Sequence, residues 1–218
     1  MKKILFFGLI IFCLSSCYLG RQVPMEFREG LKGYTGETTN ISSLININGY
    51  YVIKENTTMY FGFKGERIDT FCYMYYMFFE DGIHLDNFSL RSINKPSTSG
   101  FYKHAHWGRY TISGDTIKTK WAAIYPPLNG PPYAFERWYI VIDRNTIKEI
   151  FSKPLHATTP REMAYYLETY TYKECQPATF VPMDTLPNSD YCWLKKEKWF
   201  WRNEEDWKTH IENFGNDK

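Results

Sequence analysis

WGRYTISGDTIKTKW, residues 107–121, predicts the β-hairpin that decides the fold. Two runs rich in aromatic and β-branched residues, Trp107 to Ile112 and Thr116 to Trp121, flank Ser113-Gly114-Asp115. Such residues favour strands, and a glycine between polar neighbours favours a tight turn. The stretch therefore predicts two antiparallel strands joined by a short link.

The same pattern extends along residues 47–155 and predicts about eight short strands in sequence order. Glu80-Asp81-Gly82 and Asp143-Arg144-Asn145 supply two further tight turns. The other expected strands are Tyr50–Ile53, Met59–Phe63, Ile68–Phe79, Ile83–Leu90, Phe135–Ile142 and Ile147–Phe151. An antiparallel up-and-down barrel, or a strongly curved sheet, arranges such strands with the fewest exposed edges. We therefore predict a mainly β fold.

A family resemblance rests on the central hairpin. Its residues match a "G-x-Y-x-I-x-G-D-T-I" pattern that recurs in bacterial lipocalin-like lipoproteins, and Gly49-Tyr50-Tyr51 stands where lipocalins usually carry G-x-W. The resemblance covers about residues 47–151. It implies a calycin-type, lipocalin-like barrel and suggests that the barrel binds a ligand.

The remaining residues, 156–218, predict a helical, Trp-rich extension that packs on the barrel. Thr159-Pro160-Arg161-Glu162 is typical of a capping box at a helix start, and Asn203 with the following acids predicts a second helix. The tryptophans between Trp193 and Trp207 fit either a cover over the barrel or a surface for a protein partner.

The N-terminus indicates export. Lys2 and Lys3 precede an apolar run, and Leu14-Ser15-Ser16-Cys17 resembles the lipobox of bacterial lipoproteins. The resemblance implies a signal peptide over residues 1–16 and a lipid on Cys17. An ordinary cysteine in a soluble secreted protein is the alternative. Residues 17–46 are expected to form the lipidated cysteine and a flexible tether. Tyr18 favours the outer membrane of a Gram-negative bacterium, and the lack of an acidic run after Cys17 favours its periplasmic face.

The charge balance and the cysteines indicate which partners and which disulfide to expect. Without residues 1–16, 24 basic and 24 acidic side chains remain. This balance gives no electrostatic reason to expect nucleic acid. Cys175 and Cys192 are the preferred pair for a disulfide in the loop-rich C-terminal part, and Cys72 is expected to be a small buried hydrophobe.

Aromatic residues provide the candidate binding site. Both alternating faces of residues 71–79, FCYMYYMFF, are apolar. Either other elements cover the outer face, or one face lines an apolar cavity. The candidates for such a cavity combine apolar area with a hydrogen-bond donor: Tyr73, Tyr75, Trp107, Tyr110, Trp121 and Trp138.

Catalytic and metal-binding patterns are weak. His104 and His106 would share one face of a strand, with His84 as a third ligand, but the flanking Lys103 favours solvent exposure. Glu80, Asp81 and Asp86 surround a turn, where solvated acids are ordinary. No nucleophile elbow, zinc-helix motif or phosphate loop is present. We therefore expect no enzyme, no metal and no cofactor.

These patterns together predict a lipid-anchored envelope protein with a lipocalin-like barrel that binds a small apolar ligand or lipid. The same fold with a packed interior, acting in protein interaction or as an envelope scaffold, is the alternative.

Overall fold

The computed structural model describes residues 23–61, 66–86, 88, 105–123, 133–156, 159–169 and 175–214. Eight strands form a closed barrel in sequence order, and every neighbouring pair is antiparallel. The mainly β prediction is confirmed. The strands are β1 (Gly49–Phe61), β2 (Glu66–Phe78), β3 (Ile83–Asp86), β4 (His106–Ser113), β5 (Thr116–Ala123), β6 (Tyr133–Asp143), β7 (Thr146–Pro154) and β8 (Ala178–Pro182).

Strand β8 closes the barrel from within the C-terminal extension. It pairs with β1 from Gly49 to Val52 and with β7 at Thr146 and Ile147. The predicted barrel boundary at residue 155 is therefore wrong. The predicted strands at 50–53 and 59–63 join into the single strand β1, so the eighth strand comes from farther along the chain.

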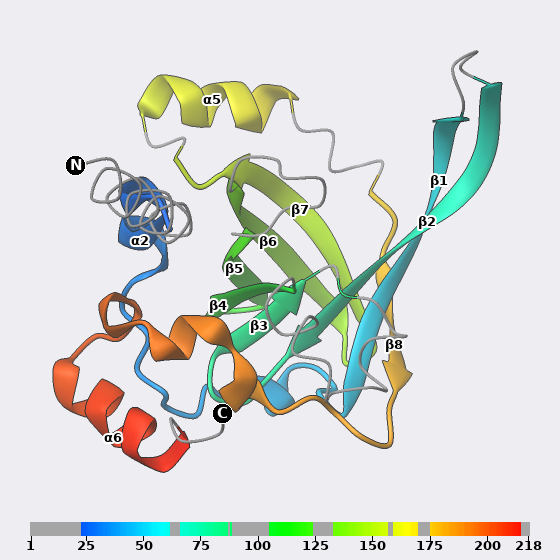
Figure 1. Cartoon of the computed structure of the whole chain (residues 1–218). Helices are drawn as coiled ribbons and strands as arrows, with labels where there is room; N and C mark the ends of the chain where they lie inside the picture. Colours follow the sequence, from blue (N-terminus) through cyan, green and yellow to red (C-terminus); the bar gives the residue numbers. More distant parts are fainter. Residues whose placement is uncertain are drawn as a thin grey trace, which may run out of the picture.

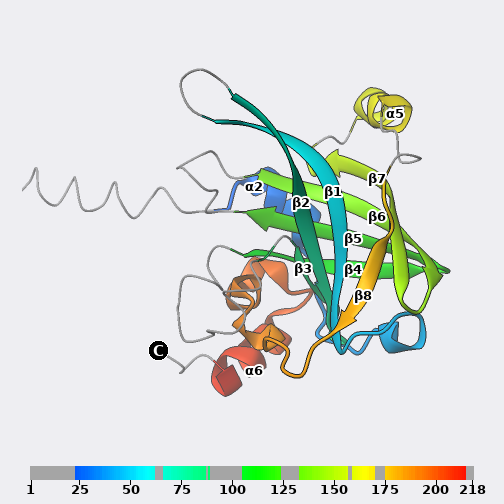
Figure 2. The same cartoon turned by 90° about the vertical axis from the view of Figure 1, so that its right-hand side faces the viewer.

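Strands β1 and β2 continue beyond their neighbours as a two-stranded arm (Figures 1 and 2). They pair with each other from Tyr51 to Phe61, whereas β3 reaches β2 at three positions from Tyr76 to Phe78. The far half of this hairpin has no third strand among the described residues.

One end of the barrel, called here the closed end, collects the turns between β2 and β3, β4 and β5, and β6 and β7. Gly82 (φ +85°) and Gly114 (φ +62°) occupy left-handed positions in two of these turns, where glycine avoids the Cβ clash. The 3-10 helix η1 (Ile41–Ser43) lies at this end, because Asn46 N donates to Arg144 O at 2.9 Å and Arg144 donates to Ser42 O at 2.9 Å.

Two hydrophobic cores lie on opposite sides of the barrel wall. The inner core fills the closed half and includes Ile41, Ile53, Phe78, Tyr110 and Tyr139. The outer core covers β3, β4 and β5. Its members include Leu31, Ile83, Trp107, Leu194 and Phe200. On β2 the end next to β3 buries both faces, because Tyr76 and Phe78 belong to the inner core and Met77 to the outer core. This explains why the sequence is apolar on both faces there.

The flexible tether predicted for residues 17–46 is wrong for its described part, from Val23 onward. Helix α2 (Met25–Leu31) buries Phe27 and Leu31 in the outer core. Ile41 and Ile45 are fully buried in the inner core. A tether would leave these side chains in water, whereas their burial stabilises the packed segment by about 1.5–3 kcal/mol for each large apolar side chain.

Residues 192–201 of the C-terminal extension pack on the outer face of the barrel, as members of the outer core (Figure 1). Thr159 and Glu162 form a reciprocal capping box at the start of α5 (Pro160–Thr169). Asn203 accepts from Asp206 N at the start of α6 (Glu204–Phe214). No helix in the described ranges is long and apolar enough to cross a membrane.

The predicted Cys175–Cys192 disulfide is not formed in the structure. Cys192 is a buried free cysteine in the outer core, beside Leu194 and Phe200. Burial raises the pKa of its thiol to about 12, so Cys192 stays protonated and behaves as a small hydrophobe.

Candidate functional site in the barrel interior

Strand β3 turns its polar side chains into the barrel. Its sequence Ile83-His84-Leu85-Asp86 alternates, and Ile83 and Leu85 belong to the outer core. Since neighbouring side chains on a strand point to opposite faces, His84 and Asp86 face inward. Both are fully buried. The packing of β3 against the C-terminal segment thus inverts the usual arrangement, in which polar side chains face water.

Arg137 on β6 faces His84 and Asp86 across the interior. Its Nη1 donates to Asp86 Oδ2 at 2.9 Å, and its Nε lies 3.9 Å from Glu149 Oε2 on β7. The guanidinium also stacks 5.2 Å from the centre of the Trp121 ring. One cation therefore serves two buried carboxylates.

His106, the first residue of β4, extends this group. Its ring stacks on Trp121 at 4.7 Å between centroids, and its Nε2 lies 3.2 Å from Tyr133 Oη. We call His84, Asp86, His106, Arg137 and Glu149 the inner polar cluster. It lies beyond the inner core, toward the end of the barrel where β3 and β5 end and β4 and β6 begin.

Several buried polar atoms of this region have no hydrogen-bond partner among the described residues. They are both ring nitrogens of His84, Oδ1 of Asp86, Nδ1 of His106, Nε of Arg137, the indole nitrogen of Trp121 and the hydroxyl of Tyr139. Folded proteins pair the great majority of such groups, because an unpaired one costs about 1–3 kcal/mol. Their concentration inside one barrel makes this region the candidate functional site.

Burial sets the protonation states of the cluster. Together with the charge of Arg137, it lowers the pKa of His84 to about 3 and that of His106 to about 4. Both imidazoles are therefore neutral at physiological pH. Burial raises the pKa of Asp86 to about 6 against the opposing effect of Arg137. At pH 7 Asp86 is therefore ionised beside the Arg137 cation.

Because His84 and His106 are buried in the neutral form, we expect the protein to lose stability in mild acid. The unfolded chain protonates a histidine near pH 6.5, whereas folded His84 stays neutral down to about pH 3. Acidification between these values therefore favours unfolding. The loss at pH 5 is about 2 kcal/mol for each buried histidine. Asp86 acts in the opposite direction, because the folded state binds its proton first as pH falls below about 6.

Urea unfolding at pH 7.5 and pH 5.0 measures this effect. From pH 7.5 to pH 5.0 the free energy of unfolding should fall by about 2 kcal/mol less in His84→Leu than in the wild type. His156 is exposed and gives a matched control, so His156→Leu should follow the wild-type curve. A His84→Leu variant that keeps the full wild-type dependence would contradict the protonation state assigned to His84.

The structure separates the six aromatic candidates for a cavity. Tyr110 faces inward at the closed end, and Trp121 faces inward beside the inner polar cluster. The other four lie on the outer face, because the alternation of their strands points them away from the interior. They are Tyr73, Tyr75, Trp107 and Trp138. These four do not line the barrel interior.

No metal centre forms in the part of the chain that the structure describes. It contains no group of three or more His, Cys, Asp or Glu side chains that could hold an ion. His84 and His106 both face inward, but their surroundings supply Arg137 instead of a third ligand. His104 and Cys17 lie outside the described residues.

Sequence reasoning missed most of the inner polar cluster. The position of Asp86 near a turn predicts a solvated acid, and no sequence pattern singles out Arg137 or Glu149 as site residues. One signal was available: the pattern His84-Leu85-Asp86 alternates, and a strand covered on its outer face must turn its polar residues inward.

The comparisons with known proteins add no family to this description. The chain was compared with protein-family models, with curated proteins and with solved structures, and no match was found in any of the three.

Proposed function

We propose that this protein is an envelope lipoprotein, held at the periplasmic face of an outer membrane through Cys17, whose lipocalin-like barrel binds a small amphiphilic molecule. The observation that carries the proposal is the set of unpartnered polar atoms around the inner polar cluster. A ligand with hydroxyl or amide groups satisfies them, whereas an interior built for packing alone would contain apolar side chains.

The charges of the cluster restrict the polar head of the ligand. Asp86 and Glu149 outnumber Arg137, and both histidines are neutral. A carboxylate head would add a third carboxyl group to a buried cluster that holds one cation. An uncharged head that donates and accepts hydrogen bonds fits the cluster better, which favours a lipid such as a monoacylglycerol over a free fatty acid.

An aromatic group next to the cluster suits the apolar part of the ligand. Trp121, Tyr133 and Phe135 form a contact triangle, with ring centroids 5.5–6.2 Å apart. They lie at the end of the barrel opposite η1. The closed half is filled by its own aromatic side chains, such as Tyr76 and Tyr139 at 5.3 Å. The proposed ligand therefore enters from the end opposite η1.

Native mass spectrometry of the full chain in a mild detergent tests the proposal. We expect mono-olein to bind at one molecule per chain and at least tenfold more tightly than oleate, a difference of about 1.4 kcal/mol or more. Trp121→Leu should weaken mono-olein binding about tenfold. Trp138→Leu removes a tryptophan from the outer face and should bind like the wild type.

Thermal unfolding by circular dichroism confirms that both variants are folded before binding is compared. If neither lipid binds the wild-type chain, the proposed ligand-binding function is excluded, and a role in protein interaction or as an envelope scaffold becomes the better hypothesis. If oleate binds as tightly as mono-olein, the role of the carboxylates in selecting the ligand is wrong.

A further inference from the structure

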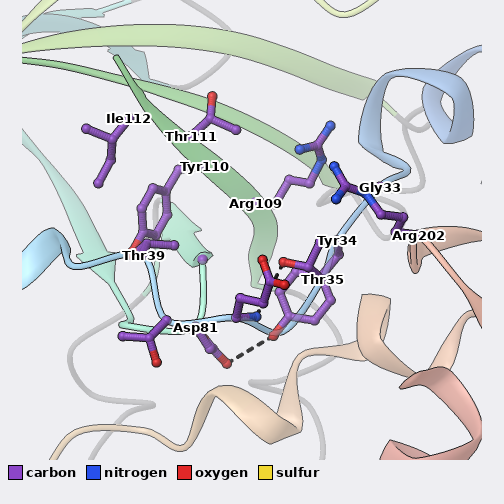
Figure 3. A pocket seen from close by; sticks show the side chains of 13 residues that line it. Gly33, Tyr34, Thr35, Thr39, Asp81, Arg109, Tyr110, Thr111, Ile112 and Arg202 are labelled. Carbon is purple, nitrogen blue, oxygen red and sulfur yellow. Dashed lines mark hydrogen bonds between the residues drawn. The ribbon is translucent and has the colours of Figure 1, made fainter. Parts of the chain in front are cut away.

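A polar groove lies outside the barrel, near the closed end (Figure 3). It forms because β3 is four residues long, so that no described strand pairs with the β3 side of β4 beyond Tyr110, whose backbone nitrogen donates to Gly82 O at 2.9 Å. Residues 33–39 cross this gap, and Thr39 N donates to Glu80 O at 2.8 Å. The groove encloses about 370 Å³, the size of a small-molecule site.

Two arginines from different parts of the chain converge in this groove (Figure 3). Arg109 on β4 is fixed by its Nε, which donates to Leu31 O at 2.7 Å. Arg202 is fixed through its backbone, whose nitrogen donates to Tyr34 O at 2.8 Å. Neither guanidinium forms an ion pair with a described residue, so their remaining N–H groups are available to a ligand.

The surrounding acids do not neutralise this pair. Glu136 lies near Arg109 but forms an ion pair with Lys153 at 3.5 Å. Asp81 is bound by Lys195 at 2.7 Å. Glu37 is the remaining acid that lines the groove, so the two guanidiniums retain a net positive charge.

The two arginines also repel each other. Burial lowers the pKa of Arg109, and the charge of Arg202 lowers it further. An arginine nonetheless remains a cation in proteins. Backbone contacts hold these two cations together, and no carboxylate of a described residue bridges them. An anion between them would therefore stabilise the pair.

We infer that this groove binds an oxyanion of the phosphate class between Arg109 and Arg202. The dianion of a phosphomonoester matches the two positive charges, whereas one carboxylate matches a single guanidinium. Thr35 and Thr111 line the same groove and supply hydroxyl groups. The Thr35 hydroxyl accepts from Glu37 N at 3.3 Å, which leaves its hydrogen to donate. This site is separate from the barrel interior and does not depend on the proposed lipid ligand.

Titration calorimetry of the full chain in a neutral detergent, with inorganic phosphate and with glycerol 3-phosphate, tests the inference. Arg202→Gln should weaken binding of both probes about tenfold or more, since it removes one of two charge-assisted contacts. Arg202 is exposed, so the variant should fold. Arg161→Gln removes the same charge from the exposed face of α5 and should bind like the wild type.

The source of the phosphate group is resolved by a second comparison. Binding of the wild type and of Arg202→Gln is measured on phosphatidic acid nanodiscs and on phosphatidylcholine nanodiscs. Because both proteins carry the same N-terminus, a difference between them in the preference for phosphatidic acid reports the groove alone. A difference identifies a lipid headgroup, and no difference together with binding of glycerol 3-phosphate identifies a soluble phosphomonoester. Equal phosphate affinity in wild type and Arg202→Gln, or no binding to the wild type, would overturn the inference.

Discussion

Arg137→Met is expected to destabilise the protein by about 3–5 kcal/mol at pH 7.5, because it leaves buried carboxylates without their cation. Asp86 is 1% exposed and Glu149 8% exposed, and Arg137 lies within 2.9 Å and 3.9 Å of them. The loss should shrink at pH 5. Without Arg137 the pKa of Asp86 rises above its wild-type value, so the folded variant takes up a proton and removes one unpaired charge.

Chemical denaturation at both pH values measures this prediction. Asp86→Asn combined with Arg137→Met should recover part of the stability, because the two side chains are in direct contact and their effects are not additive. Lys118→Met is the control, since Lys118 lies over the Trp138 ring on the outer face of the barrel. A loss below about 1 kcal/mol for Arg137→Met would mean that the carboxylates are not held by this cation.

Lys195→Met is expected to cost about 3 kcal/mol and to loosen the C-terminal segment. Lys195 is 3% exposed, and its Nζ lies 2.7 Å from Asp81 Oδ2 and 2.8 Å from Asp190 Oδ1. Burial alone would lower its pKa, but the two acids outweigh burial and raise it. Asp81 Oδ2 also accepts from Tyr34 and Ser189, so one buried ammonium ties three parts of the chain together.

Hydrogen exchange read by mass spectrometry should locate the effect. We expect faster exchange in residues 189–201 and unchanged exchange in β5 and β6. Lys198→Met is the control, because Lys198 and Glu204 form an ion pair at the surface, where water screens the attraction and such pairs contribute little to stability. Uniformly faster exchange over the whole chain would assign Lys195 a global role instead of a local one.

The hairpins of the barrel were predictable because their signals are local. Gly82 and Gly114 adopt positive φ angles that their turns require, and the flanking runs have the composition of strands. Strand β8 was not predictable in the same way. Its five residues, ATFVP, end in a proline and follow a segment with helical signals, so its place is fixed by the open edges of β1 and β7.

The candidate site shows a second limit of sequence patterns. Alternation on β3 and β6 was visible, but it does not say which face meets water. That choice depends on α2 and on the C-terminal segment, which cover the outer face of β3 and β4. Once the outer face is covered, Trp107 lies outside the barrel and Asp86 inside it, the reverse of what their polarity suggests.

The late position of β8 also has a consequence for folding. Gly49 at the start of the barrel pairs with Pro182, so closure must bring together residues that are far apart in the chain. Such non-local pairing raises the contact order and slows folding, because loop entropy is lost before the contacts form. Until residues 178–182 leave the ribosome, β1 and β7 remain unpaired on one side. A nascent or truncated chain that ends before Ala178 therefore exposes two strand edges, and we expect it to aggregate or to need a chaperone.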